Sequence, residues 1–130
     1  MAIVTTVACI AFLLPLTATS VTKPEEPLKP LTVEEKILAT FPDATIMLEV
    51  AYCESGVQTP DDCWGPINPK AKNPYSTAKG VFQILDGTWK YAECVGDPYN
   101  EDDNIACAKI LYEDSGTRPW NASKHAWGAI

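Results

Sequence analysis

Glu54 is the residue of this chain whose type and position best suit catalysis. It ends a series at the helical spacing i, i+3, i+4, i+7, which runs through Met47, Val50, Ala51 and Glu54. A carboxyl group on an apolar helix face, in the last turn, has a raised pKa, because burial and the negative end of the helix dipole both oppose ionisation. A glutamic acid that keeps its proton near neutral pH is suited to general-acid catalysis. The alternative interpretation is an exposed glutamate in a frayed final turn.

Boundary signals predict the helices that position this carboxyl group. Thr32 and Glu35 form a capping-box pattern ahead of an apolar stretch, and Pro42 ends the first helix. Asp43 is placed to cap a second helix, which carries the candidate acid and ends before Gly56. The acid is therefore expected at the end of a helix, beside whatever follows it.

The rest of the domain is also predicted to be mainly helical. The range 58–79 is rich in Pro, Asn, Asp and Lys and is predicted to form a long structured loop. The sequence of the apolar run 80–85 does not indicate which type of secondary structure it forms. A helix over 86–94 is expected to be capped by its first residue, an aspartate. Asn100 caps a further helix, whose acidic first turn suits the helix dipole and which stops near Gly116.

The N-terminus predicts export. Residues 1–22 carry no charge, and their apolar run is shorter than the roughly 20 residues that span a bilayer. Small residues follow and suit signal-peptidase cleavage, so 1–20 is interpreted as a signal peptide. An uncleaved anchor or a buried helix is the alternative. The three prolines of 21–30 indicate a stiff linker, which leaves 31–130 as the domain.

Four cysteines remain after removal of the signal: Cys53, Cys63, Cys94 and Cys107. An even count in an exported chain indicates disulfides, and four cysteines allow three pairings. Proximity in sequence favours Cys53–Cys63 and Cys94–Cys107. A zinc site is a poor alternative, because the chain has no C-x-x-C pair and one histidine.

Composition and charge exclude several classes of protein. The 130 residues are 46% hydrophobic, with four Trp, five Tyr and three Phe, which is enough to nucleate a core rather than stay disordered. Asp plus Glu outnumber Lys plus Arg by 17 to 10. The net charge of −7 argues against binding to nucleic acid or to anionic lipid surfaces. A small secreted protein stapled by disulfides fits best.

Several short motifs occur in the order and approximate spacing of the lysozyme-like fold. They are Cys53-Glu54-Ser55-Gly56, Asn73-Pro74-Tyr75-Ser76, Gly80-Val81-Phe82-Gln83-Ile84, Thr88-Trp89 and Asn104-Ile105. Over roughly residues 43–123 the chain resembles the catalytic domain of soluble lytic transglycosylases, and it is similar to resuscitation-promoting factor domains. The Ala-Tyr-Asn-Ala-Gly segment of the transglycosylases is only approximated by 120–123, so their tyrosine has no clear equivalent.

The resemblance implies cleavage of the β-1,4 bond between N-acetylmuramic acid and N-acetylglucosamine in peptidoglycan. Glu54 would first act as acid and then as base, while the muramyl 6-hydroxyl closes a 1,6-anhydro ring. Hydrolysis as in a lysozyme is the close alternative, and it would call on a second carboxylate such as Asp61 or Asp62. A weakly active glycan-binding module on the same fold, or a structural or inhibitory secreted protein, also stays open.

Other residues are candidates for substrate binding by the same resemblance: Ser55, Tyr75, Ser76, Phe82, Gln83, Trp120 and Asn121. Each has a structural alternative, since hydroxyl and amide groups also brace loops and aromatic residues also fill cores. Trp89 and Trp127 are assigned to the core. The expected partner is the glycan strand of peptidoglycan, with no cofactor, no metal and no membrane insertion once the signal is removed. The protein is expected to be a monomer, secreted or held in the cell envelope.

Overall fold

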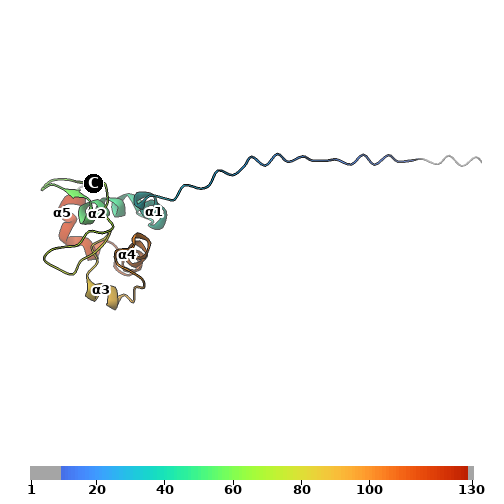
Figure 1. The fold of residues 1–130 in the computed structure, drawn as a ribbon. Coiled ribbons are helices and arrows are strands. Elements are labelled where there is room, and N and C mark those ends of the chain that lie inside the picture. Colours follow the sequence, from blue (N-terminus) through green and yellow to red (C-terminus); the bar gives the residue numbers. More distant parts are fainter. Residues whose placement is uncertain (1–9, 129–130) are drawn as a thin grey trace, which may run out of the picture.

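The computed structural model describes residues 10–128. Residues 10–31 form no helix or strand and lead away from the folded part as an extended segment (Figure 1). The first nine residues of the predicted signal peptide lie outside the described residues, so the signal stays a prediction. Within 10–128, none of the helices has both the length and the apolar character that crossing a bilayer requires.

The folded part is a small, mainly helical domain, as the sequence predicted. Its elements follow one another as α1 (Val33–Thr40), α2 (Ala44–Ser55), β1 (Val57–Gln58), β2 (Cys63–Trp64), α3 (Asp86–Tyr91), α4 (Glu101–Ser115), the 3₁₀ helix η1 (Arg118–Ser123) and α5 (Lys124–Trp127). Helix α2 contacts α1, the two strands, η1 and α5. It is therefore the element around which the domain is arranged (Figure 1).

Local capping determines where two of the helices begin. The predicted capping box is confirmed, because the Thr32 hydroxyl accepts from the Glu35 N–H and the Glu35 carboxylate accepts from the Thr32 N–H. The Asn100 side chain accepts two N–H groups at the start of α4. Asp43 precedes α2 but makes no capping hydrogen bond. Its carboxylate accepts from the Tyr112 hydroxyl instead, which joins the start of α2 to α4.

Three segments differ from the sequence predictions. An antiparallel hairpin, in which Val57 pairs with Trp64, forms where the predicted loop 58–79 begins. Helix α3 is shorter than 86–94, and its first residue does not cap it, because the Asp86 carboxylate accepts from the Lys79 ammonium at 2.5 Å. The helical turns of η1 and α5 follow Gly116, where no element was predicted.

Both predicted disulfides are confirmed. Cys53 and Cys63 have Cα atoms 5.0 Å apart, and their bridge ties the last turn of α2 to strand β2. Cys94 and Cys107 have Cα atoms 5.3 Å apart, and theirs ties the segment after α3 to the middle of α4. The first bridge therefore fixes the surroundings of Glu54, while the second lies elsewhere in the fold.

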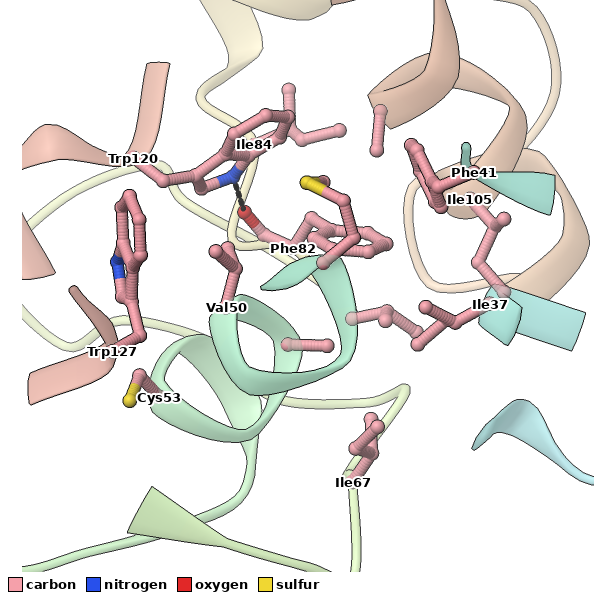
Figure 2. Packing of buried hydrophobic residues seen from close by; sticks show 14 of the residues in the cluster. Ile37, Phe41, Val50, Cys53, Ile67, Phe82, Ile84, Ile105, Trp120 and Trp127 are labelled. Carbon is pink, nitrogen blue, oxygen red and sulfur yellow. Dashed lines mark hydrogen bonds between the residues drawn. The ribbon is translucent and has the colours of Figure 1, made fainter. Parts of the chain in front are cut away.

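Phe82 lies at the centre of the hydrophobic core (Figure 2). Its ring meets those of Phe41 and Trp120 with centroids 5.6 Å apart in both pairs. The apolar stripe of α2 packs against the same core, and Trp127 is buried there as predicted, whereas Trp89 is only partly buried against it. Burial of this stripe sets the rotation of α2 and so directs its next member, Glu54, toward the same side.

A buried asparagine holds the 79–84 segment in place. The Asn104 side chain is fully buried, accepts from the Phe82 N–H at 2.9 Å and donates to the carbonyls of Lys79 and Pro98 at 3.1 and 2.9 Å. Gly80 has φ +78°, and a Cβ there would lie 2.2 Å from the Pro98 carbonyl oxygen. Only glycine fits this close approach of two backbone segments.

Candidate active site

Glu54 lies in the last turn of α2, where the sequence placed it, and its side chain is partly buried. The helix stops directly afterwards, with the Gly56 N–H donating to the Tyr52 carbonyl. A Cβ at Gly56 would lie 2.4 Å from the Trp64 carbonyl oxygen, so the hairpin passes close against the end of the helix. The carboxyl group is thus set between α2, the hairpin and the C-terminal helical turns.

Within residues 10–128, the carboxyl group of Glu54 has one side-chain hydrogen-bond partner, Ser123. The Ser123 hydroxyl lies 2.6 Å from Glu54 Oε1, across 69 positions of sequence. The Ser123 hydroxyl oxygen also accepts from the Trp127 indole N–H at 2.9 Å and lies 3.1 Å from the Trp120 carbonyl oxygen. The last turns of the chain therefore form one side of the site and present a hydroxyl group to the acid.

The environment raises the pKa of Glu54. Burial is the larger cause, because a carboxylate loses hydration there, and the hydrogen bond from Ser123 acts in the opposite direction. Neither cause is the charge of a neighbouring side chain. The direction agrees with the one expected from an apolar helix face. A carboxyl group with these properties can donate a proton at a higher pH than an exposed glutamate.

Ser55 follows the acid but faces the protein interior. Its hydroxyl is buried and donates to the Val81 carbonyl at 2.7 Å. This bond ties the end of α2 to the segment that Asn104 also holds. The predicted contact of Ser55 with sugar is therefore corrected: the hydroxyl connects two parts of the backbone.

Two aromatic candidates are also corrected. Phe82 is fully buried, and 4% of Trp120 is exposed, so neither ring has a face open to a sugar. The Trp120 indole N–H donates to the Phe82 carbonyl at 2.9 Å, which Figure 2 draws as a dashed line. Phe82 belongs to the 80–85 run, whose type the sequence did not settle and which forms a series of turns. Trp120 belongs to η1 and packs its ring against that of Phe82.

The amide and hydroxyl candidates of the loop mainly support backbone. Gln83 has φ +48°, and its side-chain amide donates to the carbonyls of Ala71 and Gly80. The Ser76 hydroxyl accepts from the Ala78 N–H. Tyr75, Ser76 and Asn121 are exposed, Tyr75 to 95%. These three remain predicted substrate contacts.

The turn of the hairpin carries the two candidates for the second carboxylate of a lysozyme mechanism. Asp61 and Asp62 are both exposed, and Asp62 accepts from the Cys63 N–H at 2.8 Å. The adjoining Trp64 is 44% exposed on β2, and sequence reasoning did not single it out. The disulfide of Cys63 fixes the base of this hairpin beside the end of α2.

Sequence reasoning also missed Ser123, which was considered only as the last residue of the imperfect motif at 120–123. A usable signal was its spacing, three residues after Trp120 and four before Trp127, which places the hydroxyl between two tryptophans on helical turns. Two hollows of the folded part lie away from Glu54, one lined by residues of α1 and α4 and another by residues of α3 and α4.

Comparisons of the chain with models of protein families, with curated proteins and with solved structures found no match. The similarity to lytic transglycosylases therefore stays a prediction that rests on the ordered motifs.

Proposed function

We propose that this protein is an exported glycosidase that cleaves the β-1,4 bond between N-acetylmuramic acid and N-acetylglucosamine in peptidoglycan. The observation that carries the proposal is the Glu54 carboxyl group, partly buried at the end of α2, raised in pKa and bound by one hydroxyl group. The substrate class comes from the motifs around it. The two disulfides favour an oxidising compartment, as expected for a protein secreted or held in the cell envelope.

The proposed reaction uses one carboxyl group twice. Protonated Glu54 donates its proton to the glycosidic oxygen as the bond from this oxygen to the muramyl C1 breaks, so N-acetylglucosamine leaves with a 4-hydroxyl group. The carboxylate then takes the proton of the muramyl 6-hydroxyl, whose oxygen bonds to C1 and closes a 1,6-anhydro ring. Glu54 ends the cycle protonated, and no water is consumed.

Hydrolysis of the same bond is the second candidate, favoured by one observation. Asp61 and Asp62 are exposed on a hairpin that the Cys53–Cys63 bridge anchors beside Glu54. A second carboxylate on the far side of a sugar ring either activates a water molecule or acts as nucleophile. The product then keeps a reducing end in place of the anhydro ring.

Mass spectrometry of the products tests the proposal. Purified peptidoglycan is digested with the protein, and soluble fragments are compared with those of the Asp61→Asn and Asp62→Asn variants. Anhydro fragments, released by all three proteins, are the expected result. Fragments heavier by one water, lost in one aspartate variant, would select hydrolysis instead. Absence of any fragment from the folded protein would refute the proposed function.

A further inference from the structure

Ser123 has two acceptors for one proton. Its hydroxyl oxygen lies 2.6 Å from Glu54 Oε1 and 3.1 Å from the Trp120 carbonyl oxygen, while the Trp127 indole N–H donates to it at 2.9 Å. An indole nitrogen can only donate, and a serine hydroxyl has one proton and two lone pairs. Trp127 therefore fills one lone pair of the oxygen and leaves the proton a choice between Glu54 and Trp120.

We propose that Ser123 is a positioning residue whose hydroxyl proton changes acceptor with the protonation state of Glu54, which lets one carboxyl group act first as acid and then as base. The inference rests on the proposed function, because only a carboxyl group with both roles needs a partner suited to both states.

In each protonation state of Glu54, the contact between Oε1 and the Ser123 oxygen can be a hydrogen bond in this geometry. When the carboxyl group is ionised, Ser123 donates to Oε1, and 2.6 Å is the length of a charge-assisted O–H···O⁻ bond. When it is protonated, its own O–H donates to the free lone pair of Ser123, whose proton turns to the Trp120 carbonyl. The heavy atoms need not move, so the change of state requires only a rotation of the hydroxyl.

Charged groups of the surrounding elements do not supply this function. Helix α2 packs against α1, both strands, η1 and α5. Burial raises the pKa of Glu54 and the hydrogen bond from Ser123 lowers it, and neither cause is the charge of an ionisable group on these elements, the hairpin turn or α2 itself. Those groups are Glu34, Glu35, Lys36, Glu49, Tyr52, Asp61, Asp62, Arg118, Lys124 and His125.

Titration of the Glu54 carboxyl carbon by ¹³C NMR tests the inference without any need for activity. In Ser123→Ala the pKa of Glu54 is expected to rise above that of the parent, because alanine cannot donate to the carboxylate. Ser123→Thr keeps the hydroxyl and is expected to bring the pKa back toward the parent value. Ser115→Ala is the matched control, since the Ser115 hydroxyl contacts Asp114 on α4 and not Glu54. Trp127→Phe removes the indole donor and is expected to raise the pKa as well.

The pH profile of peptidoglycan cleavage gives the second readout. The alkaline limb of Ser123→Ala should move to higher pH, because Glu54 holds its proton longer, while the maximal rate falls about tenfold, or about 1.4 kcal/mol of activation free energy. An unchanged pKa of Glu54 in folded Ser123→Ala overturns the inference, as does a threonine variant that resembles alanine. If Ser123→Ala raises the pKa of Glu54 but the parent protein never cleaves peptidoglycan, the proposed function is refuted and, with it, the double role of the carboxyl group.

Discussion

Removing the two disulfides one at a time should separate the stability of this domain from the geometry of its candidate site. The variants are Cys53→Ala with Cys63→Ala, and Cys94→Ala with Cys107→Ala. The bridges close loops of similar length, with sequence separations of 10 and 13. In the chain-entropy treatment each bridge contributes about 3 kcal/mol to the free energy of unfolding, and the two loops differ by only about 0.2 kcal/mol. The pairs are therefore matched in stability.

Their positions relative to Glu54 are not matched. Cys53 directly precedes the acid, and its bridge holds the hairpin against the last turn of α2. The bridge of Cys94 and Cys107 joins the segment after α3 to α4, on elements that do not contribute Glu54 or Ser123. We expect the first pair of substitutions to lower cleavage of peptidoglycan well beyond the second, at equal loss of stability.

Urea unfolding gives the stability of both variants, and cleavage is then measured in a buffer where unfolding curves show both to be more than nine-tenths folded. Equal loss of about 3 kcal/mol with unequal loss of cleavage is the expected outcome. Equal cleavage by the two variants would refute the reasoning that the Cys53–Cys63 bridge shapes the site.

Two further predictions concern stability alone. Because the pKa of Glu54 is raised on folding, its contribution to stability is complete below its ordinary value of 4.5 and is lost as pH rises through the raised pKa. Glu54→Gln should lack this loss, so urea unfolding across pH should show its advantage over the parent growing with pH; parallel curves would contradict this. Asn104→Ala should lower the free energy of unfolding by about 3 kcal/mol, because one buried and two partly buried backbone groups lose their partner. A loss no greater than that of exposed Asn121→Ala would argue against this role.

Features that depend on neighbouring residues were predictable from the sequence. The capping box of Thr32 and Glu35 and the Asn100 cap are side chain to backbone bonds over two or three residues. The two disulfides close short loops, so proximity alone selected the pairing. The apolar stripe before Glu54 is also a pattern of residues close in sequence, so it predicted that the acid lies at the end of its helix.

Features that depend on tertiary contacts were not predictable in this way. Ser123 meets Glu54 across 69 positions, and no local pattern encodes that meeting. Phe82 was a candidate for sugar binding by resemblance, with a core role as the alternative, and periodicity does not show which apolar residue occupies the centre of a core. Ser55 and Gln83 illustrate the same limit for polar groups, since a hydroxyl or amide that braces backbone has the same sequence signature as one that binds a ligand.

Cleavage of a peptidoglycan suspension by Glu54→Gln, followed as loss of turbidity beside the parent, tests the assignment of the active site most directly. Glutamine keeps the shape of the side chain but has no acidic proton for the leaving oxygen. General acid–base assistance is typically worth about 10²–10⁴-fold, and because one residue supplies both acid and base, the loss is expected at or beyond the upper end. Asp61→Asn and Asp62→Asn should retain cleavage. If Glu54→Gln, folded by circular dichroism, keeps more than about a tenth of the parent rate, Glu54 is not the catalytic acid.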